Sequence, residues 1–225
     1  MSRKATAAPP APVWAPALSD RLTELNQQLI EQLRGGAVVT GAASGVPHLT
    51  AALAEEWRAL DSAAERRLAA CPYLLLDAGF SQPERWEPPS AVRVMEAPAS
   101  GGYFQSRGGV ALVRRALVFA WHLASCNPAL ARISLAMSAA TAERLARSSL
   151  GDLEALAECA PAWIVPRWEQ QPRVWRQLLR AARAGDTSGL RQAQLRGLQL
   201  LAARVAPLRG PHGALAPRCP PGRTL

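Results

Sequence analysis

Leucines recur at helical spacing near the start of the chain, and this pattern predicts an amphipathic helix. The residues that share its apolar face are Leu18, Leu22, Leu25, Leu29 and Leu33. Two consecutive glycines, Gly35 and Gly36, come directly after it and are expected to end the helix, since glycine is common just beyond helix C-termini.

Two further helices are expected before residue 80. Apolar positions from Leu49 to Leu60 mark one of them, and Asp61 is placed to cap the next, which must end before Pro72. The apolar run from Tyr73 to Leu76 is too short for its periodicity to distinguish a strand from a buried helical turn. Residues 18–80 are therefore predicted to be an N-terminal helical region.

Prolines and glycines are frequent in residues 81–109, which indicates a linker and the best candidate for a domain boundary. Beyond it, residues 110–206 are predicted to form a second helical region. A first helix should run from 110 until Asn127-Pro128 interrupts it. Short helices are expected at 129–136, 139–147 and 150–159, with Ser138 and Ser149 at the junctions. Helices at 173–184, ended by Gly185, and at 190–205 complete the region.

The composition supports an all-α fold. Alanine and leucine dominate the chain, and only 5% of its residues are aromatic, which leaves few of the segments that sheets require. The Pro-rich residues 1–17 are expected to be a disordered leader, and 207–225 a disordered basic tail. Prolines interrupt any secretory signal, and no apolar stretch of about 18 residues is evident, so a cytoplasmic protein without a membrane anchor is expected. An organelle transit peptide is the alternative for the leader.

The positive charge is concentrated at the C-terminal end. The chain has a net charge of +9, and residues 173–225 carry ten arginines against the single acid Asp186, which equals the whole excess. A segment of this kind attracts phosphates or an acidic partner surface. The alternative is a solvated helix followed by a frayed tail.

The sequence contains no assembled catalytic set. Residues 37–47 resemble the Gly-rich nucleotide-binding turn of short-chain dehydrogenases, but Pro47 stands where that pattern has a glycine. Lys4 is the only lysine, so the Tyr-Lys pair of those enzymes is absent. The histidines lie far apart, and the four cysteines have no paired spacing. We therefore expect a non-enzymatic protein without a cofactor or a metal site.

Residues of about 116–180 resemble the core of FlhD, a subunit of the heteromeric flagellar transcription activator of bacteria. The resemblance runs without an evident gap, in one register. It is carried by Leu117-Val118-Phe119-Ala120-Trp121-His122-Leu123, Ala131-Arg132-Ile133-Ser134-Leu135-Ala136-Met137, Glu143-Arg144-Leu145, Leu150, Leu153, Leu156-Ala157-Glu158 and the basic–aromatic–acidic triplet Arg167-Trp168-Glu169.

The resemblance implies a helical, dimer-forming subunit that acts in transcription with a second protein, FlhC, and contributes helix-turn-helix-like elements. It covers less than a third of the chain, and residues 1–100 have no recognisable counterpart. Ile164 stands where the family has a cysteine, so a covalent bridge between subunits is not expected there. A divergent, FlhD-like regulator is the interpretation that these departures allow.

The three short helices at 129–159 are typical of a helix-turn-helix unit, but their charges are balanced or acidic. The better candidate for DNA contact is the next helix, where arginines recur at spacings of three and four residues: Arg173, Arg176, Arg180 and Arg183. Trp175 lies beside this stripe and can equally belong to the core. The alternative function is a protein-interaction adaptor whose basic end contacts an acidic protein surface.

The helix at 110–124 is expected to present an apolar face to a homodimer partner or an FlhC-like protein. Val113, Leu117 and Trp121 are the interface candidates. A small helical domain that follows the linker is expected to have too few residues to bury all the apolar surface of this helix by itself. The competing possibility is that the N-terminal helices of the same chain cover this face.

Overall fold

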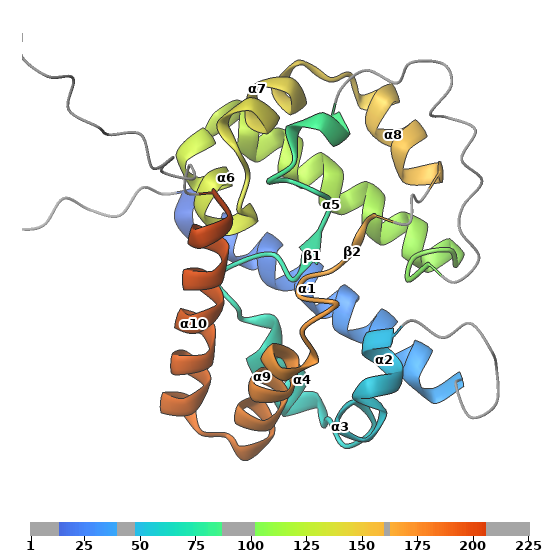
Figure 1. The fold of residues 1–225 in the computed structure, drawn as a ribbon, viewed down its shortest axis with the longest axis vertical. Coiled ribbons are helices and arrows are strands. Elements are labelled where there is room, and N and C mark those ends of the chain that lie inside the picture. The colour runs from blue at the N-terminus through green and yellow to red at the C-terminus, as the bar shows by residue number, and fades with distance from the viewer. Residues whose placement is uncertain (1–13, 40–47, 87–101, 160–162, 206–225) are drawn as a thin grey trace, which may run out of the picture.

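The computed structural model describes residues 14–39, 48–86, 102–159 and 163–205, and it is almost entirely helical (Figure 1). This confirms the all-α fold. The α-helices of the described residues are α1 (Trp14–Val39), α2 (His48–Ala52), α3 (Ala54–Arg58), α4 (Ser62–Ala69), α5 (Arg107–Cys126), α6 (Pro128–Leu135), α7 (Ala139–Arg147), α8 (Leu150–Cys159), α9 (Pro172–Ala184) and α10 (Thr187–Val205). Two short strands, β1 (Leu76–Asp77) and β2 (Val165–Pro166), and one 3₁₀ turn, η1 (Pro83–Trp86), accompany these helices.

Residues 14–77, here called the first half, form a long helix with three short helices packed against it. Helix α1 contacts α2, α3 and α4, and its leucine face is buried as the spacing predicts. Asn26 lies fully buried on this face. Its side-chain nitrogen donates to the carbonyl of Tyr73 at 2.9 Å, and its oxygen accepts from the Leu75 amide at 2.8 Å. This pair of bonds ties the segment before β1 to α1.

Residues 107–166, the second half, repeat this plan. Helix α5 contacts α6, α7 and α8, and the chain then continues into β2. The expected junctions are confirmed: the Ser138 hydroxyl accepts from Thr141 N, and the Ser149 hydroxyl accepts from Asp152 N. Asn127 also caps α6 through Leu130 N, with Pro128 in its first turn.

The two halves meet at their long helices and at their strands. Helices α1 and α5 are in contact, and β1 pairs antiparallel with β2, Leu76 opposite Pro166 and Asp77 opposite Val165. Figure 1 shows the strand pair at the centre of the molecule. The run from Tyr73 to Leu76 is therefore extended at its end, which settles the question that periodicity leaves open.

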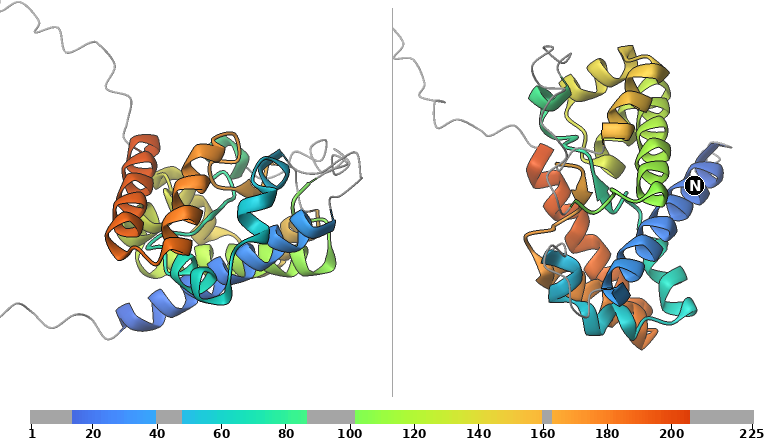
Figure 2. Two further views of the ribbon diagram at one scale, coloured as in Figure 1. Left: turned by 90° about the horizontal axis from the view of Figure 1, so that it is seen from below. Right: turned by 90° about the vertical axis from the view of Figure 1, so that its right-hand side faces the viewer.

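Helices α9 and α10 come after β2 and lie side by side at the edge of the molecule (Figures 1 and 2). Helix α9 packs on α3 and α4 of the first half, and α10 packs on α9 and α6. Gly185 joins the two helices in the left-handed conformation, with φ of 66°, as a C-terminal glycine commonly does.

Helix α1 is longer than the sequence predicts at both ends. It includes Gly35 and Gly36, which were expected to end it, and it begins at Trp14, inside the expected leader of 1–17. A glycine inside a helix lowers the stability of the helix by only about 1 kcal/mol relative to alanine. Packing of the other residues of the helix can therefore outweigh this loss. Residues 1–13 of the leader and the tail at 207–225 lie outside the described residues.

The expected helix from Leu49 to Leu60 is divided. Leu53 has left the helical conformation, with φ of −129°, and its fully buried side chain lies between α2 and α3. Leu49, Leu53 and Trp57 are nevertheless all fully buried, as their shared spacing predicts. Residues 37–47, which resemble a nucleotide-binding turn, are described only in part. Residues 37–39 continue α1 and do not form a strand, and 40–47 lie outside the described residues.

The predicted boundary at 81–109 does not separate two hydrophobic cores. Buried residues on both sides of it belong to one cluster, and Phe80, Tyr103 and Phe104 are part of that cluster. Within the segment itself, η1 packs on α7, whereas 87–101 lie outside the described residues. The two halves therefore share a single core.

The interface predicted on α5 is wrong for two of its three residues. Val113 and Leu117 are fully buried inside this single chain, and only Trp121 is partly exposed. Helices α6, α7 and α8 contact α5 together with the N-terminal helix α1, so the competing possibility of cover by the N-terminal helices accounts for only part of the cover.

Helix α5 also corrects the expectation that the chain contains no apolar stretch of membrane-spanning length. Among the described residues it is the one helix long and apolar enough to cross a bilayer. Core helices of soluble proteins commonly share this property, and in α5 Val113 and Leu117 are fully buried within the chain.

Candidate nucleic-acid interface and a polar pocket

The four arginines singled out by their spacing lie on one helix, α9, as predicted. Its opposite face is buried, because Val174, Trp175, Leu178, Leu179 and Ala182 all point into the core. Trp175 is a core residue: it packs on Trp57 with ring centroids 5.4 Å apart, and its indole nitrogen donates to the Arg167 carbonyl. The helix is thus anchored on one side and presents arginine on the other.

Arg176 differs from its three neighbours because it has an acidic partner. Its Nε donates to Glu56 Oε1 at 2.9 Å, across the contact between α9 and α3. Burial alone raises the pKa of Glu56, but the hydrogen bond and positive charge of Arg176, together with the charge of Arg180, outweigh it and hold the pKa below its ordinary value. Arg176 therefore helps to seat α9 and is only partly exposed.

Arg173, Arg180 and Arg183 are exposed and form no ion pair with any described residue. Helix α10 adds two exposed arginines, Arg191 and Arg196, of which Arg196 lies 3.4 Å from the Gln177 side chain of α9. The nearby acid Asp186 is engaged with the backbone, since its carboxylate accepts from Ser188 N and Gly189 N at the start of α10. The pair α9 and α10 is thus a basic surface with little neutralising charge.

The three short helices α6, α7 and α8 form no comparable basic surface. On α7, Arg147 lies 4.0 Å from Glu143, and Arg144 donates to the Pro83 carbonyl. On α8, Asp152 caps the helix, and hydrogen bonds from the Ser149 hydroxyl and backbone lower the pKa of its carboxyl. The charge balance that the sequence shows for this unit therefore holds at its surface.

Arg167 is the residue whose role could not be inferred from the sequence alone. It is only 1% exposed, and its guanidinium donates to the carbonyls of Leu74 and Leu135. Asp77 Oδ2 lies 3.8 Å away. Burial lowers the pKa of Arg167, Asp77 opposes this, and the nearby charge of Arg204 adds to the lowering. The arginine thereby joins β1, α6 and the segment after β2 at the centre of the molecule.

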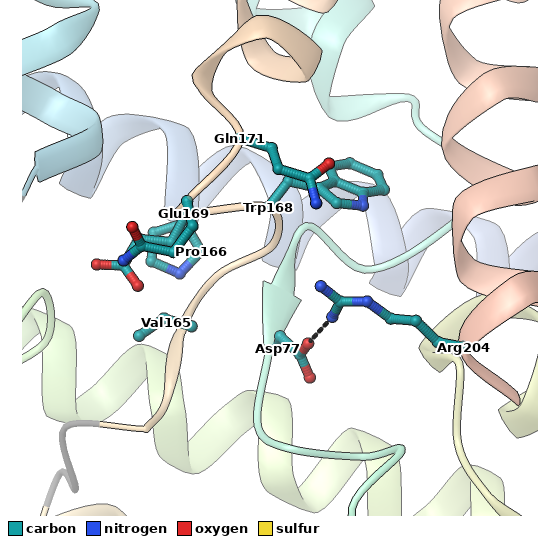
Figure 3. A pocket seen from close by; sticks show the side chains of 8 residues that line it. Asp77, Val165, Pro166, Trp168, Glu169, Gln171 and Arg204 are labelled. Atoms are coloured by element: carbon teal, nitrogen blue, oxygen red, sulfur yellow. Dashed lines mark hydrogen bonds and ion pairs between the residues drawn. The ribbon is translucent and has the colours of Figure 1, made fainter.

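A small pocket opens beside this buried arginine (Figure 3). It has a volume of about 120 Å³ and lies between β1, the segment from β2 to α9, and the last turn of α10. Arg204 of α10 closes one side and donates to Asp77 Oδ2 at 2.9 Å. The lining residues are Asp77, Val165, Pro166, Trp168, Glu169, Gln170, Gln171 and Arg204.

Trp168 has two unusual features in this pocket. Its φ is 52°, in the left-handed region that a bulky residue rarely adopts. Its indole nitrogen is buried and has no hydrogen-bond partner among the described residues. In the sequence Trp168 stands out only as part of the resemblance triplet, and no sequence signal indicates its backbone conformation.

The histidines and cysteines include one close pair that reasoning from the sequence missed. His122 and Cys126 are four residues apart on α5, and Nδ1 lies 3.7 Å from Sγ. Both side chains are exposed. Cys71 is buried instead, and this burial raises the pKa of its thiol to about 12. Within the described residues, no group of three or more metal-ligating side chains gathers.

The comparisons with known proteins add no functional evidence. No protein-family model, no curated protein and no solved structure has a significant match to this chain. Only its own residues and their geometry bear on its function.

Proposed function

We propose that this protein is a non-enzymatic, FlhD-like subunit of a transcription regulator that contacts DNA through the arginine face of α9, either weakly or within a complex. The observation that carries this proposal is the set of three exposed arginines, Arg173, Arg180 and Arg183, that form no ion pair with any described residue. The resemblance of residues 116–180 to FlhD agrees with it but is not matched by any family model.

The arginines project from a firmly seated helix, which favours phosphate contact over random solvation. Trp175 packs in the core, Arg176 pairs with Glu56, and the guanidinium of Arg67 donates to the Ala182 carbonyl at the end of α9 at 2.7 Å. These three contacts fix the orientation of α9 relative to the rest of the molecule. Guanidinium groups held in place lose less conformational freedom when they bind phosphate.

The expected mode of contact is with the phosphate backbone, not with base edges. Arginine and lysine contacts to phosphates supply most non-specific affinity, whereas sequence is read by groups placed in a groove. Gln177 lies between Arg173 and Arg180 on the same stripe, but its side-chain oxygen already accepts from Arg196 Nη1 of α10 at 3.4 Å. Specificity is therefore assigned to a partner, of which an FlhC-like protein is the candidate.

The decisive experiment is a titration of labelled duplex DNA with the full chain at several salt concentrations. Three neutralised phosphates predict a slope of about −2.7 in a plot of log affinity against log salt concentration. The triple variant Arg173→Ala, Arg180→Ala, Arg183→Ala should reduce the slope to near zero. A matched control changes three exposed arginines on other helices, Arg66, Arg107 and Arg132, to alanine and should retain the wild-type slope.

Two outcomes would contradict the proposal at different points. If the wild-type chain binds no duplex at low salt, even with a co-purified partner present, the regulator function fails and the protein-interaction adaptor remains. If duplex binding persists with the same slope in the triple variant, the assignment to α9 is wrong although DNA binding survives.

Self-association belongs to the same proposal and needs a surface other than the one predicted on α5. Val113 and Leu117 are internal, but three large apolar side chains are exposed on other helices: Ile133 at 61%, Leu150 at 51% and Leu195 at 54%. Light scattering on the full chain at tens of micromolar tests whether a dimer forms. Ile133→Ser, Leu150→Ser and Leu195→Ser, made singly, then identify the helix that carries the contact.

A further inference from the structure

Two arginines meet one carboxylate at the end of the pocket beside Arg204. Arg167 and Arg204 face Asp77 Oδ2 at 3.8 and 2.9 Å, whereas the second carboxylate of the lining, Glu169, lies apart from them. Both oxygens of Asp77 are already used: Oδ1 accepts from Gly79 N at 3.0 Å, and Oδ2 faces the two arginines. A cation would find no carboxylate oxygen without a partner on Asp77.

The second carboxylate of the lining is also engaged. The side chain of Glu169 is hydrogen-bonded with the hydroxyl of Tyr103, and burial together with this carboxylate raises the pKa of that hydroxyl. In Figure 3 the Glu169 side chain extends away from Asp77 and Arg204. The part of the pocket near Arg204 is therefore dominated by donors.

The donor without an acceptor is the indole N–H of Trp168. The residue is 3% exposed, lines the pocket and has no hydrogen-bond partner for Nε1 among the described residues. Figure 3 shows its ring and the Gln171 side chain on one side of the pocket, with the guanidinium of Arg204 and the carboxylate of Asp77 facing them. A buried donor that lacks an acceptor is costly, and it is retained here in a residue with a strained backbone.

We propose that this pocket binds a small oxyanion, a carboxylate or a phosphate, held by the guanidinium of Arg204 and the indole N–H of Trp168. A pocket of about 120 Å³ suits an anion of only a few non-hydrogen atoms better than a nucleotide or a peptide chain. Arginine supplies paired donors that match oxygen atoms of both anion types. The bound anion gives the orphaned donor its acceptor and ties the end of α10 to the segment after β2.

The test monitors the indole N–H signal of Trp168 by NMR in the full chain labelled at tryptophan, assigned by its absence in Trp168→Phe. Sodium phosphate and sodium acetate are titrated separately at constant ionic strength, with sodium chloride as the reference. We expect a saturable downfield shift of this one signal with phosphate or acetate, and the more effective of the two identifies the chemistry. Arg204→Gln should abolish the shift, whereas Arg196→Gln, which removes the same charge elsewhere on α10, should leave it unchanged.

A Trp168 signal that shifts with none of the anions, or equally with chloride, overturns the proposal. So does a wild-type response in Arg204→Gln. Trp168→Phe separates binding from structure: it removes the unpaired donor but keeps an aromatic ring against Tyr73, so the folded protein should be at least as stable as the wild type without added anion. Its midpoint of thermal unfolding should then no longer rise with the effective anion. The outcome does not depend on whether α9 binds DNA.

Discussion

The two halves of the molecule share a layout and differ in the elements that succeed their strands. In each half a long helix carries three short helices and leads to a two-residue strand, and the two strands pair with each other. After β1 the described chain makes only the short turn η1, which packs on α7 of the second half. After β2 it makes the full helix α9, which packs on α3 and α4 of the first half, and then α10.

This exchange explains why the chain cannot be divided at its Pro/Gly-rich segment. Each half packs against the element that follows the strand of the other half, and the buried residues of both halves form one cluster. Of the two elements that follow the strands, the one after β2 contains the four arginines of the predicted interface. The basic surface therefore belongs to the part of the molecule in which the two halves differ.

The largest loss of folding stability is expected at Arg167, the buried residue that joins the two halves. Arg167→Ala removes the donors to Leu74 and Leu135 and should lower the free energy of unfolding by about 3–5 kcal/mol, the usual cost of breaking a buried ionic contact. Urea denaturation measures it. Arg21→Ala, which breaks the exposed contact with Glu24, is the control and should cost about 0.5 kcal/mol or less. Equal effects would mean that the junction of the halves adds nothing to stability.

A second test addresses the packing of α10, the element without a counterpart in the first half. A methyl group added at Gly197 would stand 2.7 Å from Tyr73 Cζ and 3.0 Å from Trp168 Cη2. Gly197→Ala should therefore destabilise the protein by about 1–3 kcal/mol, despite the better helix propensity of alanine. Gly151→Ala on α8 meets only the Ser149 hydroxyl, at 3.7 Å, and should stabilise by about 0.5–1 kcal/mol. Thermal unfolding of both variants decides whether α10 packs tightly.

The helix caps provide a smaller comparison between the halves. Asp61 caps α4 in the first half through Ala64 N, and Ser138 and Ser149 cap α7 and α8 in the second. Each change to alanine should cost about 1 kcal/mol in urea denaturation. Ser149→Ala should also return the pKa of Asp152 upward toward its ordinary value, because that residue loses the hydroxyl that lowers it, as an NMR titration of the carboxyl would show. A much larger loss at one cap would indicate that its half unfolds separately.

The weakest effect is expected at the contact between Glu56 and Arg176, which seats α9 on the first half. The folded protein lowers the pKa of Glu56, so this contact stabilises above the unfolded value of 4.5 and is lost as the pH falls through the lower folded value. Glu56→Gln should therefore be less stable than wild type by about 1 kcal/mol or less at pH 7, and this difference should shrink as the pH falls below 4.5. Urea denaturation at a series of pH values measures this, and a difference in stability that stays constant as the pH falls would show that the carboxylate charge is not responsible.

Most of the helices can be predicted from the amino-acid sequence, because periodicity and caps are local properties. The spacing of apolar residues predicts α6, α7 and α8 to within a residue at either end. Their caps are local too, since the side chains of Asn127 and Ser138 accept hydrogen bonds from backbone amides three residues later. The arginine stripe of α9 is equally local, since residues three and four apart share a helical face. The part of the basic surface that lies on α9 can be inferred from this spacing alone.

Whether a side chain is exposed or is paired and buried inside the chain, in contrast, depends on the tertiary structure. Arg167 reaches a carbonyl 93 residues away, and Arg176 finds its carboxylate 120 residues away, so neither partner leaves a sign in the neighbouring sequence. Val113 and Leu117 form the apolar face that their spacing predicts, but the cover for that face comes from other helices of the chain, α1 among them. Local interactions select the conformation of a segment, whereas its partners depend on how distant segments pack together, which no short-range pattern encodes.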